Sequence, residues 1–505
     1  MFRTLILLLL SIQFFTLKAQ VKRDLTKSQW KEDINFLKTQ IKKTFPDFDD
    51  RISETAFDSQ LEASLNQESS TEIVLEIQRA LGLLEDEGTS IYPFQKAFDS
   101  PVLPIKSYWF SDGMYICDAN EANQPLIGKK IVRINGETVE NLFEKMKPYL
   151  PGDNLSYKKY AFPMYSQISA WLTAAGTESM EKYITLELEN GESINVPFET
   201  VSEYIKIKRN LVGNRESGFT GKKFEGSYYW KEYIPEHKLL TIQFLRIIND
   251  PSGIPFKQFV KEISNDLNEK DIERIIVDNR FGGGGNGFKL KPFTDLIKNH
   301  LISYPEKALF IFTSRATKGT IAELTSILAN NTPAILVGEN TGEGANSVGD
   351  IKKIELPNSG INVSVTHTLW KTSWDKDVRN TLQPEKTIAY SHEHHKSRQD
   401  PWYNATLSMP EEKPSKALLS SEMRQKLVGS YSIGGQKMTI YEDNGKVYAT
   451  VKRAIKSFFE LHTQLYDGGA NRLSTDLNDV FIFYDMNGNR PILSVQWKEI
   501  LIENP

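Results

Sequence analysis

The stretch IIVDNRFGGGGNG, residues 275–287, decides the fold of this chain. Its first three residues form a short apolar run, as in a strand that is covered on both faces of a sheet. Two similar runs follow, at 309–312 (LFIF) and 334–337 (AILV), and amphipathic helical segments separate the three runs. This alternation predicts a βαβαβ core with a parallel sheet, in which ligands bind where strand ends meet the following helices.

The glycine tract at 282–287 has two interpretations. Consecutive glycines let backbone N–H groups approach a ligand closely, which suits a phosphate or an oxyanion, and Gly283, Gly284 and Gly285 are the candidate binding residues. The alternative is a tight turn from strand to helix. The glycine spacing matches neither the dinucleotide fingerprint nor the P-loop, so nucleotide binding is disfavoured and we expect no cofactor.

Working outward, the sequence predicts five segments. Trp30 to Phe45 carries apolar residues at helical spacing, and Ser69 with Glu72 forms a capping box for a second helix. Asn-Gly pairs between alternating strands predict hairpins in the third and last segments. The segments are 1–19 (signal peptide), 20–98 (N-terminal helical subdomain), 99–210 (PDZ-like β-rich region), 215–408 (α/β core) and 420–505 (small C-terminal antiparallel β domain). The PDZ-like assignment depends on residues 126–139, for which a generic β-hairpin is the alternative.

Composition bears on nucleic-acid binding, metal sites, disulfides and export. The 505 residues carry a net charge of −4, which gives no electrostatic reason to expect nucleic acid. The seven histidines and the single cysteine, Cys117, exclude cysteine-based zinc sites and intrachain disulfides, and we expect no metal. Arg3, an apolar run from Leu5 to Phe15, and Ala19 predict a cleaved signal peptide, with an uncleaved anchor as the alternative. We therefore expect an exported protein, periplasmic or secreted, with no transmembrane anchor after cleavage.

Four blocks of sequence occur in a fixed order: the glycine tract, 312–324 (FTSRATKGTIAEL), 337–345 (VGENTGEGA) and 382–385 (LQPE). In this order and spacing they resemble the C-terminal-processing (tail-specific) serine peptidase family. The nearest branch is the one shared with interphotoreceptor retinoid-binding protein and the tricorn core. The resemblance covers about residues 25–407 and implies a crotonase-like or ClpP-like core, with a helical start and a PDZ-like insert.

The resemblance also implies which positions carry catalysis. The family's nucleophilic serine lies three residues before a glutamate, and three residues before Glu323 is Thr320; a shift of one residue places Gly319 there instead. The family's histidine base corresponds to Gly88, and the lysine of the other branch corresponds to Gly344. The late acidic residue corresponds to Val378, with Asp377 adjacent. A hydroxyl without a base is a poor nucleophile, so the resemblance implies impaired or lost catalysis.

Other groups could supply a base, and each has a structural alternative. Lys318 is close to Thr320 in sequence, but a solvated residue before a helix is the alternative. His367 falls in a strand at 363–369, where a half-buried structural histidine is the alternative. The histidines of residues 392–395 could bind metal, but we expect a hydrated loop there, and we expect the acidic residues 85–87 to form a solvated turn.

Two hypotheses for the function remain. The first is an exported serine-type peptidase that acts on proteins, with Thr320 as its nucleophile. The second is a non-catalytic relative that keeps the cleft and binds peptide or unfolded-protein C-termini, or an apolar small ligand. Because both the nucleophile and the base positions are altered, residue chemistry favours binding over cleavage.

Overall fold

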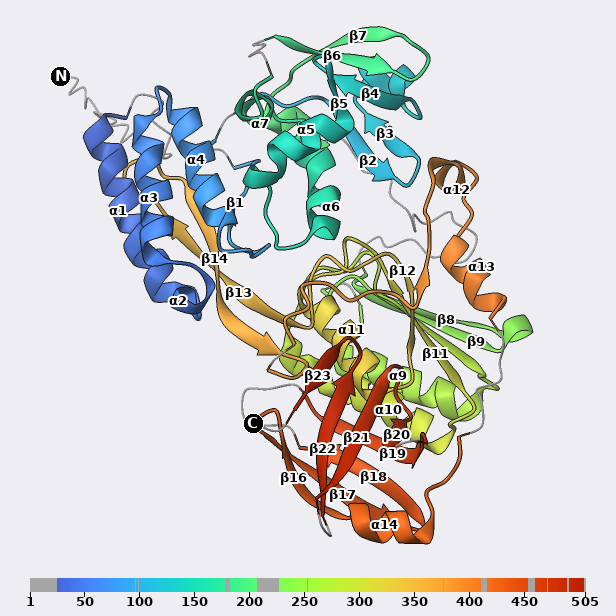
Figure 1. Cartoon of the computed structure of the whole chain (residues 1–505). Coiled ribbons are helices and arrows are strands. Elements are labelled where there is room, and N and C mark those ends of the chain that lie inside the picture. Colours follow the sequence, from blue (N-terminus) through green and yellow to red (C-terminus); the bar gives the residue numbers. More distant parts are fainter. Residues whose placement is uncertain are drawn as a thin grey trace, which may run out of the picture.

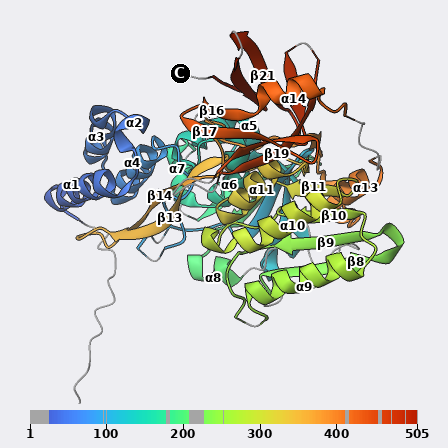
Figure 2. The same ribbon diagram turned by 90° about the horizontal axis from the view of Figure 1, so that it is seen from below.

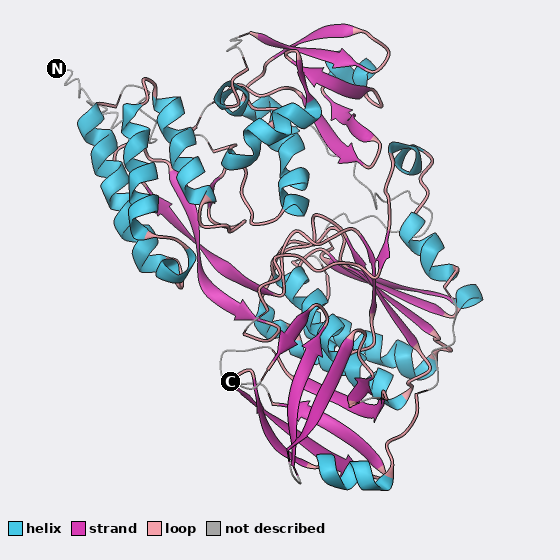
Figure 3. Cartoon of the chain, viewed as in Figure 1, coloured by secondary structure: helices cyan, strands magenta, loops and turns pink. Residues whose placement is uncertain are grey.

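The computed structural model describes residues 25–503, except for 96, 99, 178–181, 207–226, 252, 376, 410–415, 453–458, 470 and 488–489. Helices, three open sheets and a C-terminal β domain make up these residues (Figures 1 and 3). The predicted signal peptide lies outside the described residues, as does most of the boundary predicted near residue 210. Among the described helices, none has the length and apolar content that crossing a bilayer requires.

The N-terminal helices include two that begin at capping boxes, one of which the sequence predicts. Thr26 and Gln29 form a capping box at the start of the first helix, and that helix ends before Pro46. Ser69 and Glu72 form the predicted capping box of the last helix. The apolar faces of these helices pack into one cluster with the region that follows them. The elements are α1 (Lys27–Thr44), α2 (Phe48–Arg51), α3 (Glu54–Ala63), α4 (Ser70–Gly82) and β1 (Ser90–Ile91).

The next region is a sheet with the strand order β2-β3-β4-β6-β7, which we call the insert sheet. Asn135 and Gly136 both have positive φ, which confirms the predicted tight turn between β4 and β5. Four short helices accompany the sheet. The elements are β2 (Ile105–Phe110), β3 (Gly113–Ala119), β4 (Lys130–Ile134), β5 (Glu137–Thr138), α5 (Val139–Met146), α6 (Leu155–Tyr165), α7 (Ser169–Ala174), β6 (Tyr183–Leu188), β7 (Ser193–Pro197) and α8 (Val201–Lys206).

The predicted α/β core is present, with the strand order β15-β12-β11-β10-β9-β8. Five of these strands are parallel: β9, β10, β11, β12 and β15. The sixth, β8, is an antiparallel edge strand. All residues of β10 are buried, as the continuous apolar run predicts. The elements are β8 (Tyr229–Ile234), β9 (Leu239–Phe244), α9 (Phe256–Glu269), β10 (Arg274–Asp278), α10 (Lys291–Ser303), β11 (Ala308–Thr313), α11 (Thr320–Asn331), β12 (Ile335–Gly338) and β15 (Lys386–Thr387).

A long hairpin leaves this core and reaches the N-terminal helices, which Figure 2 shows from below. It consists of β13 (Asn346–Glu355) and β14 (Asn362–Lys371), and β1 pairs with β14. The buried carboxylate of Asp33 on α1 accepts hydrogen bonds from the backbone N–H groups of Asn358 (2.8 Å) and Ser359 (2.9 Å) at the hairpin turn. The turn end of the hairpin is therefore fixed against the N-terminal helices and β1. Two helices follow it, α12 (His392–Lys396) and α13 (Pro401–Leu407).

The C-terminal region is one antiparallel sheet whose strands are ordered as they occur in the chain. Its core receives a side chain from outside the region: Trp374, in the loop after β14, is 1% exposed and lies 4.8 Å from Phe459 and 5.8 Å from Trp497, measured between ring centroids. The elements are α14 (Ser421–Leu427), β16 (Gly429–Ile433), β17 (Gln436–Asp443), β18 (Lys446–Val451), β19 (Leu461–Asp467), β20 (Arg472–Thr475), β21 (Val480–Asn487), β22 (Arg490–Trp497) and β23 (Ile500–Ile502).

Candidate functional site

The N-terminus of α11 meets the glycine tract at the carboxyl edge of the parallel sheet. Gly319 caps the helix with φ +55° and ψ −145°, a conformation that residues other than glycine rarely adopt. A Cβ at this position would lie 3.1 Å from the Gly283 carbonyl oxygen. Both positions that the sequence leaves open for the nucleophile are therefore at this junction, and Gly319 is the one that faces the glycine tract.

Thr320 is the first residue of α11 and is only 7% exposed. Within the described residues, its hydroxyl makes no hydrogen bond with a histidine, an amine or a carboxylate. A hydroxyl needs such a partner to lose its proton during attack. The local geometry thus provides a hydroxyl at a helix N-terminus, where the helix dipole favours negative charge, but no base hydrogen-bonded to it among the described residues.

Gly88, at the position of the family's histidine, is buried beneath the hairpin. A Cβ there would lie 2.4 Å from Cγ2 of Thr366 on β14. The Thr366 hydroxyl donates a hydrogen bond to the buried carboxylate of Asp86 (2.7 Å) and lies 3.0 Å from the Thr89 hydroxyl. Thr366 therefore fills the space that a side chain at position 88 would need.

Two of the three acidic residues near Gly88 are not solvated as the sequence predicts. Asp86 is 7% exposed, and burial raises the pKa of its carboxyl. Glu87 is partly buried and forms an ion pair with Lys318. The prediction of a solvated turn is therefore confirmed for Glu85, which is exposed, and wrong for Asp86 and Glu87.

Lys318 is held by this ion pair instead of being solvated. Its ammonium group lies 5.1 Å from the centroid of the Tyr157 ring. Burial lowers the pKa of Lys318, but the charges of Glu87 and Tyr157 more than offset this effect, and the net pKa is well above its usual value. An ammonium group held in this way keeps its proton and is a poor general base near neutral pH.

Two further carboxyls surround the N-terminus of α11. The side chain of Glu343, one residue before Gly344, accepts a hydrogen bond from the Gly319 N–H. Burial, and then the nearby charge of Glu87, raise the pKa of Glu343 well above its usual value. Burial and Asp350 likewise raise the pKa of Glu323 to about 8. Glu343 and Glu323 therefore lie near the N-terminus of α11, and burial raises the pKa of both carboxyls.

The glycine tract combines a tight turn with exposed amides. A Cβ at Gly282 would lie 2.5 Å from Ile321, and one at Gly285 would lie 2.7 Å from the backbone of Ile247, so both glycines are needed for close packing. The Gly283 N–H donates to the Leu245 carbonyl (3.4 Å). In the part of the chain that the structure describes, the N–H groups of Gly284 and Gly285 donate to no protein acceptor. These two amides can therefore donate to a ligand carbonyl or carboxylate.

The histidines lie away from this junction. His367 is exposed instead of half-buried, and it lies on the opposite face of β14 from Thr366, because successive residues of a strand alternate between faces. His392, His394 and His395 form α12 instead of a hydrated loop, and the ring of His392 stacks on Tyr115 of the insert sheet at 4.0 Å. The described residues contain no group of three or more potential metal ligands.

The late acidic position also differs from a catalytic arrangement. Val378 is 87% exposed, and Asp377 forms an ion pair with Arg379 (2.6 Å) two residues away. Sequence reasoning missed the roles of Glu87, Glu343 and Thr366. The role of Glu343 could have been found from its place beside Gly344, where the resemblance puts the lysine of the other branch. No local signal points to Thr366, because it contacts Asp86 across more than 270 residues of sequence.

The sequence matches no protein-family model and no curated protein. Among solved structures, mature CPAF complexed with lactacystin is similar, with a TM-score of 0.54 and 12% identity over 75% of this chain and 97% of that chain. Mature CPAF alone gives 0.53 and 12% over 75% and 96%. The match to the photosystem II D1 C-terminal processing protease covers 72% of this chain and 94% of the protease, at 11% identity and a TM-score of 0.35. The chain thus shares the fold of mature CPAF over 75% of its length.

Proposed function

We propose that this chain is an exported member of the tail-specific serine peptidase family that has lost peptidase catalysis and binds polypeptide C-terminal tails at the α11 junction. The observation that carries the proposal is the burial of Gly88 beneath Thr366, since a Cβ at this position would lie 2.4 Å from the threonine methyl carbon. The base position has no side chain and no space for one.

The surrounding charges support the same conclusion. Lys318 is paired with Glu87, and Glu343 accepts the Gly319 N–H, so neither group is positioned to take a proton from the Thr320 hydroxyl. Binding requires no such group. The Gly284 and Gly285 amides and the positive end of the α11 dipole suit the carbonyls and terminal carboxylate of an extended peptide.

Catalysis is tested with a reduced and carboxymethylated protein, which is unfolded and offers many cleavable bonds. We expect neither the wild-type chain nor Thr320→Val to produce fragments on prolonged incubation, as followed by mass spectrometry. Cleavage by the wild-type chain that Thr320→Val abolishes would overturn the proposal.

Binding is tested with a fluorescein-labelled twelve-residue peptide that ends in a free carboxylate, and with its C-terminally amidated twin, by fluorescence anisotropy. We expect saturable binding of the free carboxylate and weaker binding of the amide. Gly284→Val places a side chain where a Cβ would meet nothing within 4 Å, so it should block the tract without disturbing the fold.

The matched control is Gly429→Val in β16, where a Cβ would make only ordinary contacts, the nearest at 3.5 Å. We expect this variant to bind like the wild-type chain. Equal affinity of Gly284→Val and Gly429→Val for the peptide would remove the glycine tract from the binding site.

A further inference from the structure

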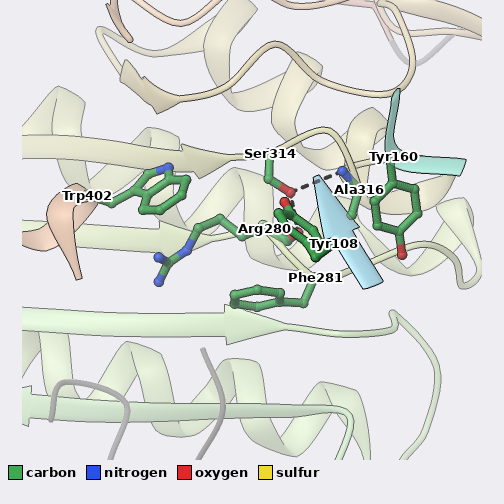
Figure 4. Close-up of a pocket in the computed structure, with 7 residues that line it drawn as sticks. All are labelled: Tyr108, Tyr160, Arg280, Phe281, Ser314, Ala316 and Trp402. Atoms are coloured by element: carbon green, nitrogen blue, oxygen red, sulfur yellow. Dashed lines mark hydrogen bonds between the residues drawn. The ribbon is translucent and has the colours of Figure 1, made fainter. Parts of the chain in front are cut away.

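The loop that joins β11 to α11 is fixed by hydrogen bonds within the protein (Figure 4). The Ser314 hydroxyl donates to the Arg280 carbonyl (2.6 Å) and accepts from the Ala316 N–H (3.1 Å). The Thr317 hydroxyl donates to the Asn279 carbonyl (2.9 Å). These bonds fix the N-terminus of α11 relative to the residues that follow β10, so a ligand meets a preformed site.

Arginine and lysine side chains around this loop are already paired with carboxylates of the protein. The pairs are Arg280 with Asp278 and Asp400 (both 2.8 Å), Arg315 with Glu339 (3.0 Å), and Lys318 with Glu87. A cation that is held in this way is a weak partner for a further anion, because the ligand has to compete with the acid that already holds it. The terminal carboxylate of a bound tail therefore depends on neutral hydrogen-bond donors at this junction.

Glu343 contacts the junction from the loop after β12. It is only 6% exposed, and its carboxyl accepts a hydrogen bond from the Gly319 N–H. The Gly342 N–H donates to the Thr317 carbonyl (3.0 Å), which holds the two loops together. Gly319 also approaches the glycine tract, since a Cβ on it would lie 3.5 Å from Cα of Gly284. Gly319 thus contacts both the Glu343 carboxyl and the tract where we propose that the tail carboxylate binds.

The charges around Glu343 favour its neutral form. The surrounding groups are Glu87 before β1, Tyr157 on α6, Lys318 and Glu323 at the start of α11, the Ser347 hydroxyl on β13, and Arg379, whose guanidinium pairs with Asp377 (2.6 Å). Because Lys318 already balances Glu87, an ionised Glu343 would add a negative charge close to two other carboxyls. Burial and a like charge both disfavour an ionised carboxylate.

A neutral carboxylic acid has an O–H group that a carboxylate lacks. One oxygen of Glu343 accepts from the Gly319 N–H, and the O–H can donate to a second carboxylate in a short, charge-assisted hydrogen bond. Ionised Glu343 would instead repel the same ligand. We propose that Glu343, in its protonated form, is a specificity-determining residue that donates a hydrogen bond to the terminal carboxylate of the bound tail, an inference that rests on the proposed function.

The pH dependence of binding tests this role. The probe is a twelve-residue peptide of glycine and serine with a tetramethylrhodamine label, so that only its terminal carboxylate is ionisable, and its affinity is measured by fluorescence anisotropy from pH 5 to pH 10. We expect the affinity of the wild-type chain to fall as the pH rises, by up to about tenfold per pH unit once Glu343 ionises. The amidated twin should bind more weakly and without this pH dependence.

Two substitutions separate donation from mere repulsion. Glu343→Gln cannot ionise and its amide still donates, so it should bind the carboxylate peptide with an affinity that does not change with pH. Glu343→Ala also removes the charge but has no donor, and we expect it to bind about tenfold more weakly than Glu343→Gln. Melting temperatures of both variants check that they fold. Glu355→Gln, the same change at an exposed position near the far end of β13, should behave like the wild-type chain.

The outcomes distinguish this inference from tail binding itself. A wild-type affinity that does not change with pH, a pH dependence that persists in Glu343→Gln, or equal affinities of folded Glu343→Gln and Glu343→Ala would overturn the role of Glu343 and leave tail binding standing. Failure of the carboxylate peptide to bind at every pH would overturn both.

Discussion

Gly88 is part of the packing beneath the hairpin, where the proposed function requires that no base be present. The Thr366 methyl group occupies the space above it, and the Thr366 hydroxyl holds the buried Asp86. A histidine introduced at position 88 would therefore not fit unless the hairpin moved away first.

Gly88→Ala should destabilise the fold, because its Cβ would lie 2.4 Å from Cγ2 of Thr366. Overpacking of this kind costs about 1–3 kcal/mol, and we expect a lower melting temperature by differential scanning fluorimetry. In a Thr366→Ser background, Gly88→Ala should lower the melting temperature much less. Serine lacks the methyl group but keeps the hydroxyl that donates to Asp86. An equal loss in both backgrounds would contradict the steric explanation.

At the scale of elements, α12 connects the core to the insert sheet through its histidines. The ring of His395 lies 5.3 Å from Phe110 on β2, and His392 stacks on Tyr115 of β3. Burial, and then the proximity of His392, lower the pKa of His395 to about 4, and burial lowers the pKa of His392. Three charged groups lie near these histidines. The carboxylate of Asp112 accepts a hydrogen bond from the backbone N–H of His392, and Glu393 and Lys396 lie on α12 itself.

This arrangement predicts a loss of α12 docking in acid. Because both pKa values are lower in the folded chain than the usual value of about 6.5, the undocked state binds more protons. The stabilisation of docked α12 by the two neutral histidines is complete above about pH 6.5 and is lost as the pH falls toward 4. Hydrogen exchange of residues 392–396, corrected for the intrinsic rate, should accelerate over this range. His395→Leu should reduce the pH dependence of this hydrogen exchange. His367→Leu, the same change at an exposed histidine, should leave the pH dependence as in the wild-type chain.

The sequence predicts these elements better than it predicts their contacts. The apolar runs of β10, β11 and β12, the apolar face of α1 and the capping box of α4 are local signals, and they are confirmed. The packing of α12 on Tyr115 and of Glu87 on Lys318 joins segments more than 200 residues apart, for which a single sequence holds no local signal. The same is true of Thr366 above Gly88.

At the scale of the whole molecule, the C-terminal sheet is more than an appended domain. Trp374 leaves the loop after β14 and completes the core of that sheet, while its own carbonyl accepts from the Asn346 side chain (2.7 Å) and the Asp377 N–H (2.9 Å). The same loop continues to Arg379, whose carbonyl oxygen lies 1.9 Å from where a Cβ on Gly344 would be. One tryptophan therefore connects the C-terminal sheet to the border of the candidate site.

Trp374→Ala should loosen both regions together. Loss of a fully buried tryptophan costs about 3–5 kcal/mol. We expect faster hydrogen exchange in β16–β23 and in residues 372–382, measured by mass spectrometry. Trp171→Ala, an equally buried tryptophan in the insert region, is the matched control and should leave exchange in β16–β23 unchanged. Acceleration confined to one of the two regions would show that they are not connected through this side chain.

Trp374 also sets an order of events during biosynthesis. Synthesis proceeds from the N-terminus, and Trp497, which packs against Trp374, belongs to β22, more than 100 residues after the loop that carries Trp374. The loop beside the candidate site cannot reach its final packing until β22 has been synthesised. A chain interrupted before β22 would leave a large aromatic surface uncovered, a feature by which quality control could distinguish an incomplete molecule from a finished one.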